Sequence, residues 1–212
     1  KCPPRSFSAQ NFNEIGATFA NAEICSTTKG PCAKLYKIDI IHRYGIRFDS
    51  DYSYGEDHLF VLEYVKHCRS IATINHSNYL YINHEGSLTN RLLAYKRLSD
   101  YAREAYLHRQ ELIALFGIEN PDYNRYIIEE RAHLIYQSIY ALYSAEGNYP
   151  AQERWRFIEE VYRQDYDMMQ EATQIPLFFR LIKIALRWKK RQPTDCALLI
   201  LSRGKEWIKK HL

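Results

Sequence analysis

Hydrophobic residues recur at three- and four-residue steps through most of the chain after residue 89. This spacing places apolar side chains along one face of a helix. Proline and asparagine mark several starts, because proline suits the first helical turn and asparagine can cap it. The pattern predicts about five helices: one from Thr89 to Gly117, one from Asn120-Pro121 to Gly147, and three that open at Pro150, Pro176 and Thr194.

The first 88 residues have a mixed pattern. Helical spacing gives way to short runs rich in Ile and Tyr, in which apolar and polar residues alternate as they do in strands. An acidic segment with several turn-forming residues, 49–55, separates two helical stretches. The pattern predicts helices over 33–44 and from Glu56 or Asp57 to Cys68, and strands over 71–74 and 79–82.

Composition limits the class of protein. With 212 residues, 46% hydrophobic and 25% charged, the chain has ordinary globular usage and room for one domain plus an extension. No stretch of the sequence approaches the roughly 20 apolar residues that span a membrane. The five cysteines show neither CxxC pairs nor zinc spacing, so a reduced, cytoplasmic protein is expected. The expected fold class is α+β, mostly α, in two parts, 1–88 and 89–212.

Positive charge gathers at the C-terminal end of the chain. Residues 175–212 contain ten Lys and Arg but only Asp195 and Glu206, a net charge of +8, whereas the whole chain carries +4. Apolar residues that include Trp lie among these basic residues, a composition typical of a helix that docks on an anionic membrane surface. A helix packed on the bundle with a solvated basic face is an equal alternative. Nucleic acid is not expected as a partner, because no binding motif accompanies the charge.

Two carboxylates, Glu56 and Asp57, lie at a predicted loop-to-helix junction directly after Gly55. The first N–H groups of a helix and its dipole favour ionised side chains there. An ionised carboxylate on a rigid element beside a cleft can take a proton from a hydroxyl nucleophile. Helix capping alone explains the same pattern, since acidic residues stabilise first turns. The spacing leaves both interpretations open.

An ordered set of short motifs between residues 30 and 90 surrounds this junction. The set comprises Lys34-Leu35-Tyr36, Ile46-Arg47-Phe48, Gly55-Glu56-Asp57 followed by Phe60, Tyr79-Leu80-Tyr81, His84 and Ser87-Leu88-Thr89. In this order it resembles the C-terminal, acceptor-side half of the catalytic domain of family 2 glycosyltransferases, which have the GT-A fold. The resemblance implies that residues 1–88 form a partial GT-A-like α/β segment, followed by the helical C-terminal bundle. Cys32 and Ala33 depart from the Trp-Asn that family members often carry.

The resemblance implies transfer of a sugar from a nucleotide-sugar donor to a glycan or lipid-linked acceptor, with inversion at the anomeric carbon. Asp57 is then the general base that deprotonates the acceptor hydroxyl, and Glu56 holds the acceptor or shapes the loop. The resemblance further implies that the substrate-binding residues are His84, Ser87, Lys34, Tyr79 and Tyr81. Of these, His84 and Ser87 correspond to groups near the donor diphosphate. Cross-strand packing explains the two tyrosines equally well, and plain solvent exposure is the alternative for Lys34 and His84.

The GT-A fold binds its donor on a Rossmann-like half, and that half ends in a metal-binding Asp-x-Asp motif. The first 55 residues show no apolar strand followed by an amphipathic helix, so this half is expected to be absent from the chain. Asp49-Ser50-Asp51 is interpreted as a chance match in an acidic loop, and no metal site is predicted. The resemblance therefore implies a nucleotide-sugar donor and Mg or Mn in the full-length protein, and a fragment that binds neither and is inactive alone.

A non-catalytic helical module is the alternative function, because most of the chain has helical spacing without chemistry. Such a module would scaffold a partner or dock on a membrane. The expected localisation is cytoplasmic, and peripheral to the inner face of the plasma membrane if residues 175–212 bind lipid.

Overall fold

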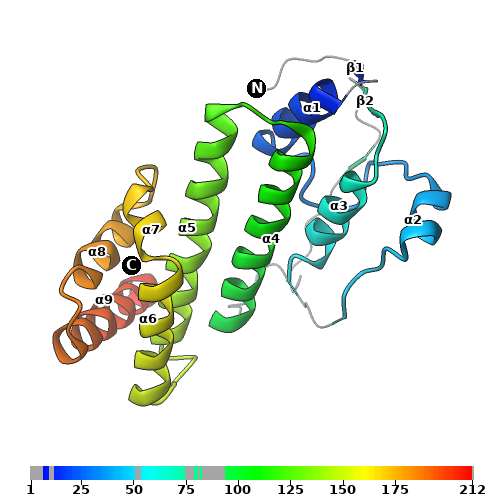
Figure 1. Ribbon diagram of the computed structural model, residues 1–212. Helices are drawn as coiled ribbons and strands as arrows, with labels where there is room; N and C mark the ends of the chain where they lie inside the picture. The colour runs from blue at the N-terminus through cyan, green and yellow to red at the C-terminus, as the bar shows by residue number, and fades with distance from the viewer. Residues whose placement is uncertain are drawn as a thin grey trace. The chain divides into compact units, whose positions relative to one another are not determined.

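The computed structural model describes residues 7–9, 12–50, 54–74, 79–80, 82 and 94–211. Within these ranges the chain is mostly helical, which confirms the predicted fold class at that level (Figure 1). The short strands pair antiparallel, with Phe7 opposite Thr73. In chain order the elements are β1 (Phe7–Ala9), α1 (Phe12–Ile24), α2 (Ile38–Tyr44), α3 (Glu56–Lys66), β2 (Ile71–Thr73), α4 (Tyr95–Phe116), α5 (Pro121–Tyr143), α6 (Ala151–Gln164), α7 (Tyr166–Glu171), α8 (Leu177–Leu186) and α9 (Arg191–His211).

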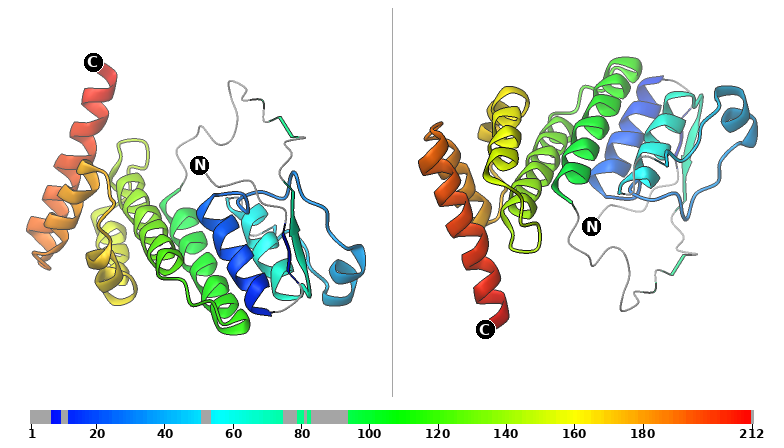
Figure 2. Two further views of the ribbon diagram at one scale, coloured as in Figure 1. Left: turned by 90° about the horizontal axis from the view of Figure 1, so that it is seen from above. Right: turned by 90° about the horizontal axis from the view of Figure 1, so that it is seen from below.

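The chain divides into two compact units. Unit 1 comprises residues 1–91 and 103–127, and unit 2 comprises residues 92–102 and 128–212. The division falls within helices α4 and α5, so each of these helices supplies residues to both units. In unit 1, helices α1, α3 and the unit 1 part of α4 lie side by side (Figure 2).

Unit 1 is built around helix α1. Its Ile15, Phe19 and Ala20 are almost fully buried. Gly16 lies among them, and a Cβ atom at this position would come within 2.9 Å of the Phe116 Cβ. Only glycine leaves room for the backbone of α1 to approach the end of α4 this closely. The core of unit 1 therefore depends on a small residue in the middle of an apolar face.

Unit 2 packs the apolar faces of helices α5, α6, α8 and α9 against one another. Its buried side chains include Ile135, Ile139, Leu142, Phe157, Ile158, Val161, Phe179, Ile182 and Leu198. Arg154 of α6 makes a two-pronged ion pair with Asp195 of α9, with N–O distances of 3.0 and 2.6 Å. Tyr143 of α5 donates a third hydrogen bond to this carboxylate, at 2.8 Å. Charge-assisted bonds of this geometry tie three helices together.

Most of the predicted helix starts are confirmed. Helix α3 begins at Glu56, and α6 and α8 begin directly after Pro150 and Pro176. The Asn120 side chain caps α5, because its Oδ1 accepts hydrogen bonds from the N–H groups of Asp122 and Tyr123, both at 3.0 Å. These are the starts for which the signal is local.

Three predicted elements differ from the structure. The helix expected over 33–44 begins only at Ile38: Ala33 is left-handed with φ 57°, and Lys37 is extended where its N–H bonds to the Tyr64 hydroxyl. Helix α9 begins at Arg191, so Thr194 lies inside it and donates to the Ala185 carbonyl at 3.4 Å instead of capping. No strand is formed at the described positions of the run 79–82, while Tyr81 lies outside the described residues.

The cysteines differ in part from the reduced set expected from the sequence. Cys25 is disulfide-bonded, so the expectation is wrong for this residue. Cys32, Cys68 and Cys196 are free thiols. In the part of the chain that the structure describes, no helix combines the length and apolar character needed to cross a bilayer.

The Asn120 cap predicts a measurable loss of stability. Replacing Asn120 with Ala leaves two N–H groups at the start of α5 without their side-chain acceptor, which costs about 1 kcal/mol. Asn124→Ala is the matched control, since Asn124 is exposed within the same helix and Ala is the better helix former. Urea denaturation of both variants measures the difference. Equal stability of the two variants would contradict a capping role for Asn120.

Candidate functional site

The junction between residue 55 and helix α3 has the geometry that the sequence predicts. Gly55 precedes the helix with φ 80°, a left-handed conformation that favours glycine. Its carbonyl accepts the first bond of the helix, from the Leu59 N–H at 2.9 Å. Glu56 and Asp57 are the first two residues of α3, and both are half-buried. Two neighbouring carboxylates therefore lie at the positive end of a helix dipole.

The environment of Asp57 changes its acidity. Burial raises the pKa of the Asp57 carboxyl above its ordinary value, and the adjacent Glu56 charge raises the pKa further. A carboxylate with a raised pKa holds a proton more strongly and is the better general base. Asp57 is thus suited to accept a proton.

An aromatic cluster joins α3 to the chain before it: Phe60 and Tyr64 of α3 contact Tyr36 and Phe48. The Phe48 and Phe60 rings stack with centroids 4.4 Å apart. The Tyr36 ring meets Phe60 edge-on at 5.5 Å and Tyr64 at 4.8 Å. Burial raises the pKa of Tyr36, and the Asp57 carboxylate lies near enough to add to the shift. The cluster therefore extends to the vicinity of Asp57.

This cluster brings together three motifs that are separate in the sequence. Tyr36 ends the Lys34-Leu35-Tyr36 motif, Phe48 ends the Ile46-Arg47-Phe48 motif, and Phe60 follows the two carboxylates. The backbone N–H of Lys37 donates to the Tyr64 hydroxyl at 2.7 Å and holds the first motif against α3. The motifs are therefore parts of one packed arrangement around a single helix.

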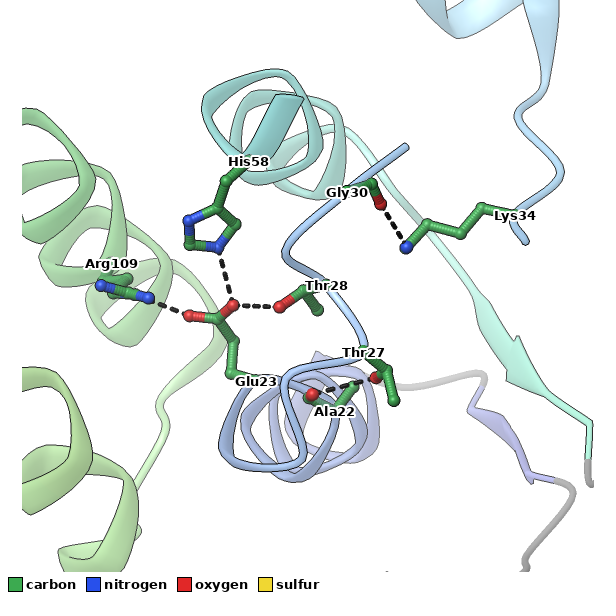
Figure 3. Close-up of polar contacts among 8 residues, drawn as sticks. All are labelled: Ala22, Glu23, Thr27, Thr28, Gly30, Lys34, His58 and Arg109. Atoms are coloured by element: carbon green, nitrogen blue, oxygen red, sulfur yellow. Dashed lines mark hydrogen bonds and ion pairs between the residues drawn. The ribbon is translucent and has the colours of Figure 1, made fainter. Parts of the chain in front are cut away.

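A buried ion cluster, formed by Glu23, Thr28, His58 and Arg109, lies between α1, α3 and α4 (Figure 3). All four residues are at most 4% exposed. The Glu23 carboxylate pairs with His58 Nε2 at 2.8 Å and with Arg109 Nε at 2.6 Å, and it also accepts a hydrogen bond from the Thr28 hydroxyl. The cluster joins α1, α3 and α4, since these helices supply Glu23, His58 and Arg109.

The charges in this cluster are balanced. Burial by itself would raise the pKa of Glu23, but the hydrogen bond from His58 and the Arg109 charge together hold it well below its usual range. Burial lowers the pKa of His58, so its ring is neutral at pH 7 and Nε2 carries the proton that it donates to Glu23. Burial and the Arg109 charge lower the pKa of the nearby Lys29 to about 8. An ionised Glu23 between Arg109 and a neutral His58 is the stable arrangement.

His58 directly follows Asp57 in the chain. Because the His58 ring is anchored to Glu23, the first turn of α3 is fixed relative to α1 and α4 within unit 1. Neither Glu23 nor Arg109 belongs to one of the sequence motifs. The signal that could have found them is a charged residue on an apolar helix face: Glu23 follows Phe19 by four positions, and Arg109 precedes Leu112 by three.

The other predicted site residues have different surroundings. The Lys34 ammonium donates to the backbone carbonyls of Gly30 and Cys32, so it braces a loop. The Tyr79 ring is 47% exposed. His84, Ser87 and Tyr81 lie outside the described residues. Of the predicted set, the structure brings together Asp57, Glu56 and the motif that contains Lys34.

The divalent metal that the resemblance implies would need several ligands from the described residues. Among them, no group of three His, Cys, Asp or Glu side chains converges. Asp49 is exposed, and Asp51 lies outside the described ranges. A hard cation such as Mg or Mn needs several converging oxygen ligands, so the donor set described by the structure does not fit it.

Comparison with known proteins found no matching family model, no significantly similar curated protein and no significantly similar solved structure.

The buried ion cluster predicts a large, pH-dependent effect of Glu23. Glu23→Gln removes the carboxylate charge that pairs with the buried Arg109, and we expect a loss of about 3–5 kcal/mol in the free energy of unfolding at pH 7. Because the folded-state pKa of Glu23 is depressed, its contribution is present above its ordinary pKa of 4.5 and is lost as the pH falls below that value. Urea titrations at several pH values measure this difference, with exposed Glu119→Gln as the control. Equal losses for both variants would exclude the proposed pairing.

The two neighbouring carboxylates predict that the pKa of Asp57 depends on Glu56. Glu56→Gln removes the like charge that raises the pKa of Asp57, so the Asp57 pKa is expected to fall. Carbon-13 NMR titration of the Asp57 carboxyl measures the pKa in the wild type and the variant, and Asp57→Asn identifies the signal. Glu119→Gln provides the control for a distant change of charge. An Asp57 pKa that stays constant or rises in Glu56→Gln would refute the coupling.

Proposed function

We propose that the chain is the acceptor-side part of an inverting glycosyltransferase similar to family 2, with a partial GT-A-like segment in its first 88 residues. The observation that carries the proposal is the position of Asp57, half-buried in the first turn of α3 with a raised pKa. The packing of three family-like motifs around the same helix supports it.

In the proposed reaction the acceptor is an alcohol, the hydroxyl group of a glycan or of a lipid-linked sugar. The Asp57 carboxylate takes the hydroxyl proton while the acceptor oxygen forms a bond to the anomeric carbon of the donor sugar. The bond from this carbon to the diphosphate oxygen breaks on the opposite face, and its electrons leave with the nucleoside diphosphate. Attack and departure on opposite faces invert the anomeric centre.

The neighbours of Asp57 have supporting roles in this proposal. Glu56 holds a second hydroxyl of the acceptor and keeps the proton affinity of Asp57 high. His58 is a positioning residue, because it ties the first turn of α3 to Glu23. We assign the exposed Tyr79 ring to the face of the acceptor sugar, since sugar faces pack on aromatic rings. Lys34 shapes the loop through its bonds to backbone carbonyls.

The donor side of the proposal follows from the resemblance alone. The resemblance assigns a nucleotide sugar as donor, with Mg or Mn beside its diphosphate. It places His84 and Ser87 near the donor diphosphate and Tyr81 in the cleft. The described residues do not fit a divalent cation, and the proposed proton transfer involves only side chains of this chain. We propose that the reaction takes place in the cytoplasm, where nucleotide sugars are made, although a disulfide such as that of Cys25 is uncommon in this compartment.

Asp57→Asn tests the proposed role directly. An amide of the same shape cannot accept the proton, so we expect sugar transfer by the intact gene product to fall about 100- to 10,000-fold. The readout is release of nucleoside diphosphate from UDP- and GDP-sugars in the presence of oligosaccharide or lipid-linked acceptors. Circular dichroism and urea denaturation check that the variant folds.

Asp39→Asn is the matched control for this experiment. Asp39 is the second residue of α2, as Asp57 is of α3, and it is exposed. If Asp57 only stabilised the helix dipole, both variants would lose a few tenths of a kcal/mol of stability and no activity. Turnover retained in Asp57→Asn would remove Asp57 as the base and would favour the non-catalytic helical module.

A further inference from the structure

Helices α8 and α9 are neighbours in unit 2 (Figure 2). The inner face of α8 is buried in the bundle through Phe179, Ile182, Ala185 and Leu186. These side chains satisfy the packing that a helix in a bundle requires. The apolar residues on the opposite face of α8 therefore need a different explanation.

That opposite face carries an exposed row of large apolar side chains, the α8 stripe. It consists of Leu177, Leu181, Ile184 and Trp188, which are 74%, 41%, 50% and 50% exposed. Their steps of four, three and four residues place them on one side of the helix and of the turn that continues it. Single exposed apolar residues are ordinary, whereas a continuous row of four marks an interaction surface.

Basic residues flank the α8 stripe. Arg180 is exposed on α8, Arg187 is exposed directly after it, and Lys190 and Arg191 are exposed where α9 begins. The sequence contains no Asp or Glu between residues 172 and 194. The next acid, Asp195, is bound by Arg154 and Tyr143. The positive charge beside the α8 stripe is therefore not balanced by acids of its own segment.

Three kinds of partner would interact differently with an apolar row flanked by positive charge. A second copy of the chain would cover the apolar row but would bring the same positive residues together, which is repulsive. A nucleic acid would neutralise the charge and leave four apolar side chains in water. A bilayer with anionic lipids takes up the apolar row between its headgroups, attracts the basic residues, and suits a Trp at the interface.

We propose that the α8 stripe and the adjoining residues Arg180, Arg187, Lys190 and Arg191 dock the protein on an anionic lipid surface. Helix α8 lies in the plane of the interface, with its apolar row among the headgroups and acyl chains. This inference concerns unit 2 alone and does not depend on the chemistry of Asp57 in unit 1. Its test needs no sugar transfer, so either proposal can fail without the other.

Flotation of the whole chain with vesicles tests the inference. Vesicles of phosphatidylglycerol and phosphatidylcholine are compared with vesicles of phosphatidylcholine alone, at low and high salt. One variant, Leu181→Ser with Trp188→Ser, removes half of the apolar row. Its control is Leu107→Ser with Leu115→Ser on α4, where both leucines are similarly exposed, at 55% and 48%.

A second variant, Lys190→Gln with Arg191→Gln, removes two charges. Its control is Lys96→Gln with Arg97→Gln, an adjacent exposed pair on α4. The wild type is expected to bind the anionic vesicles only, and more weakly at high salt. Losing two charges should weaken binding about 30-fold, the equivalent of about 1 kcal/mol for each charge. Losing half of the apolar row should weaken it about tenfold or more, and neither control should differ from the wild type.

Three results would overturn the inference. The first is an absence of binding to anionic vesicles at low salt, or equal binding to both vesicle types. The second is an equal loss of binding in the variants and their controls, with circular dichroism showing that all of them fold. The third is a dimer in sedimentation analysis that Leu181→Ser with Trp188→Ser dissociates, because a second copy would then occupy the α8 stripe.

Discussion

The Glu23 carboxylate, buried between Arg109 and His58, is the interaction on which the rest of unit 1 depends. A charge in the interior is stable only where opposite charge and hydrogen bonds replace water. Here each partner comes from a different helix, so the arrangement of α1, α3 and α4 is set by the needs of a single side chain. Hydrogen bonds also have direction, which apolar packing lacks. The buried ion cluster therefore specifies where the first turn of α3 lies.

Helix α3 is held on a second side by the aromatic cluster. Phe60 and Tyr64 contact Tyr36 and Phe48, which come from loop segments before the helix. Asp57 thus belongs to a rigid element that is fixed by ionic bonds at one contact and by ring packing at another. A site on such an element keeps its geometry better than one on a loop. This rigidity supports the proposal that Asp57 accepts the acceptor proton while Glu56 keeps the pKa of Asp57 high.

Local signals in the sequence predict much of the fold. The starts of α3, α5, α6 and α8 depend on nearby glycine, asparagine and proline, and all four are predicted correctly. The prediction fails where contacts between residues far apart in the sequence determine the local structure. The Lys37 N–H bonds to Tyr64, 27 positions away, in a segment predicted as helix. Glu23 and Arg109 are 86 positions apart, and no periodicity pairs them. The motifs around Asp57 can be recognised in the sequence, whereas the buried ion cluster that positions Asp57 cannot.

The central claim is that a carboxylate of raised proton affinity, fixed at the start of α3, is the base of a sugar transfer. The pH dependence of kcat/KM for transfer by the intact gene product tests it most directly, since this profile reports the ionisation of the essential base in the free enzyme. The account predicts that activity falls at acid pH with a midpoint equal to the Asp57 pKa found by NMR, and that this midpoint moves to lower pH in Glu56→Gln. An acid midpoint that differs from the Asp57 pKa, or that ignores the change at Glu56, would contradict it.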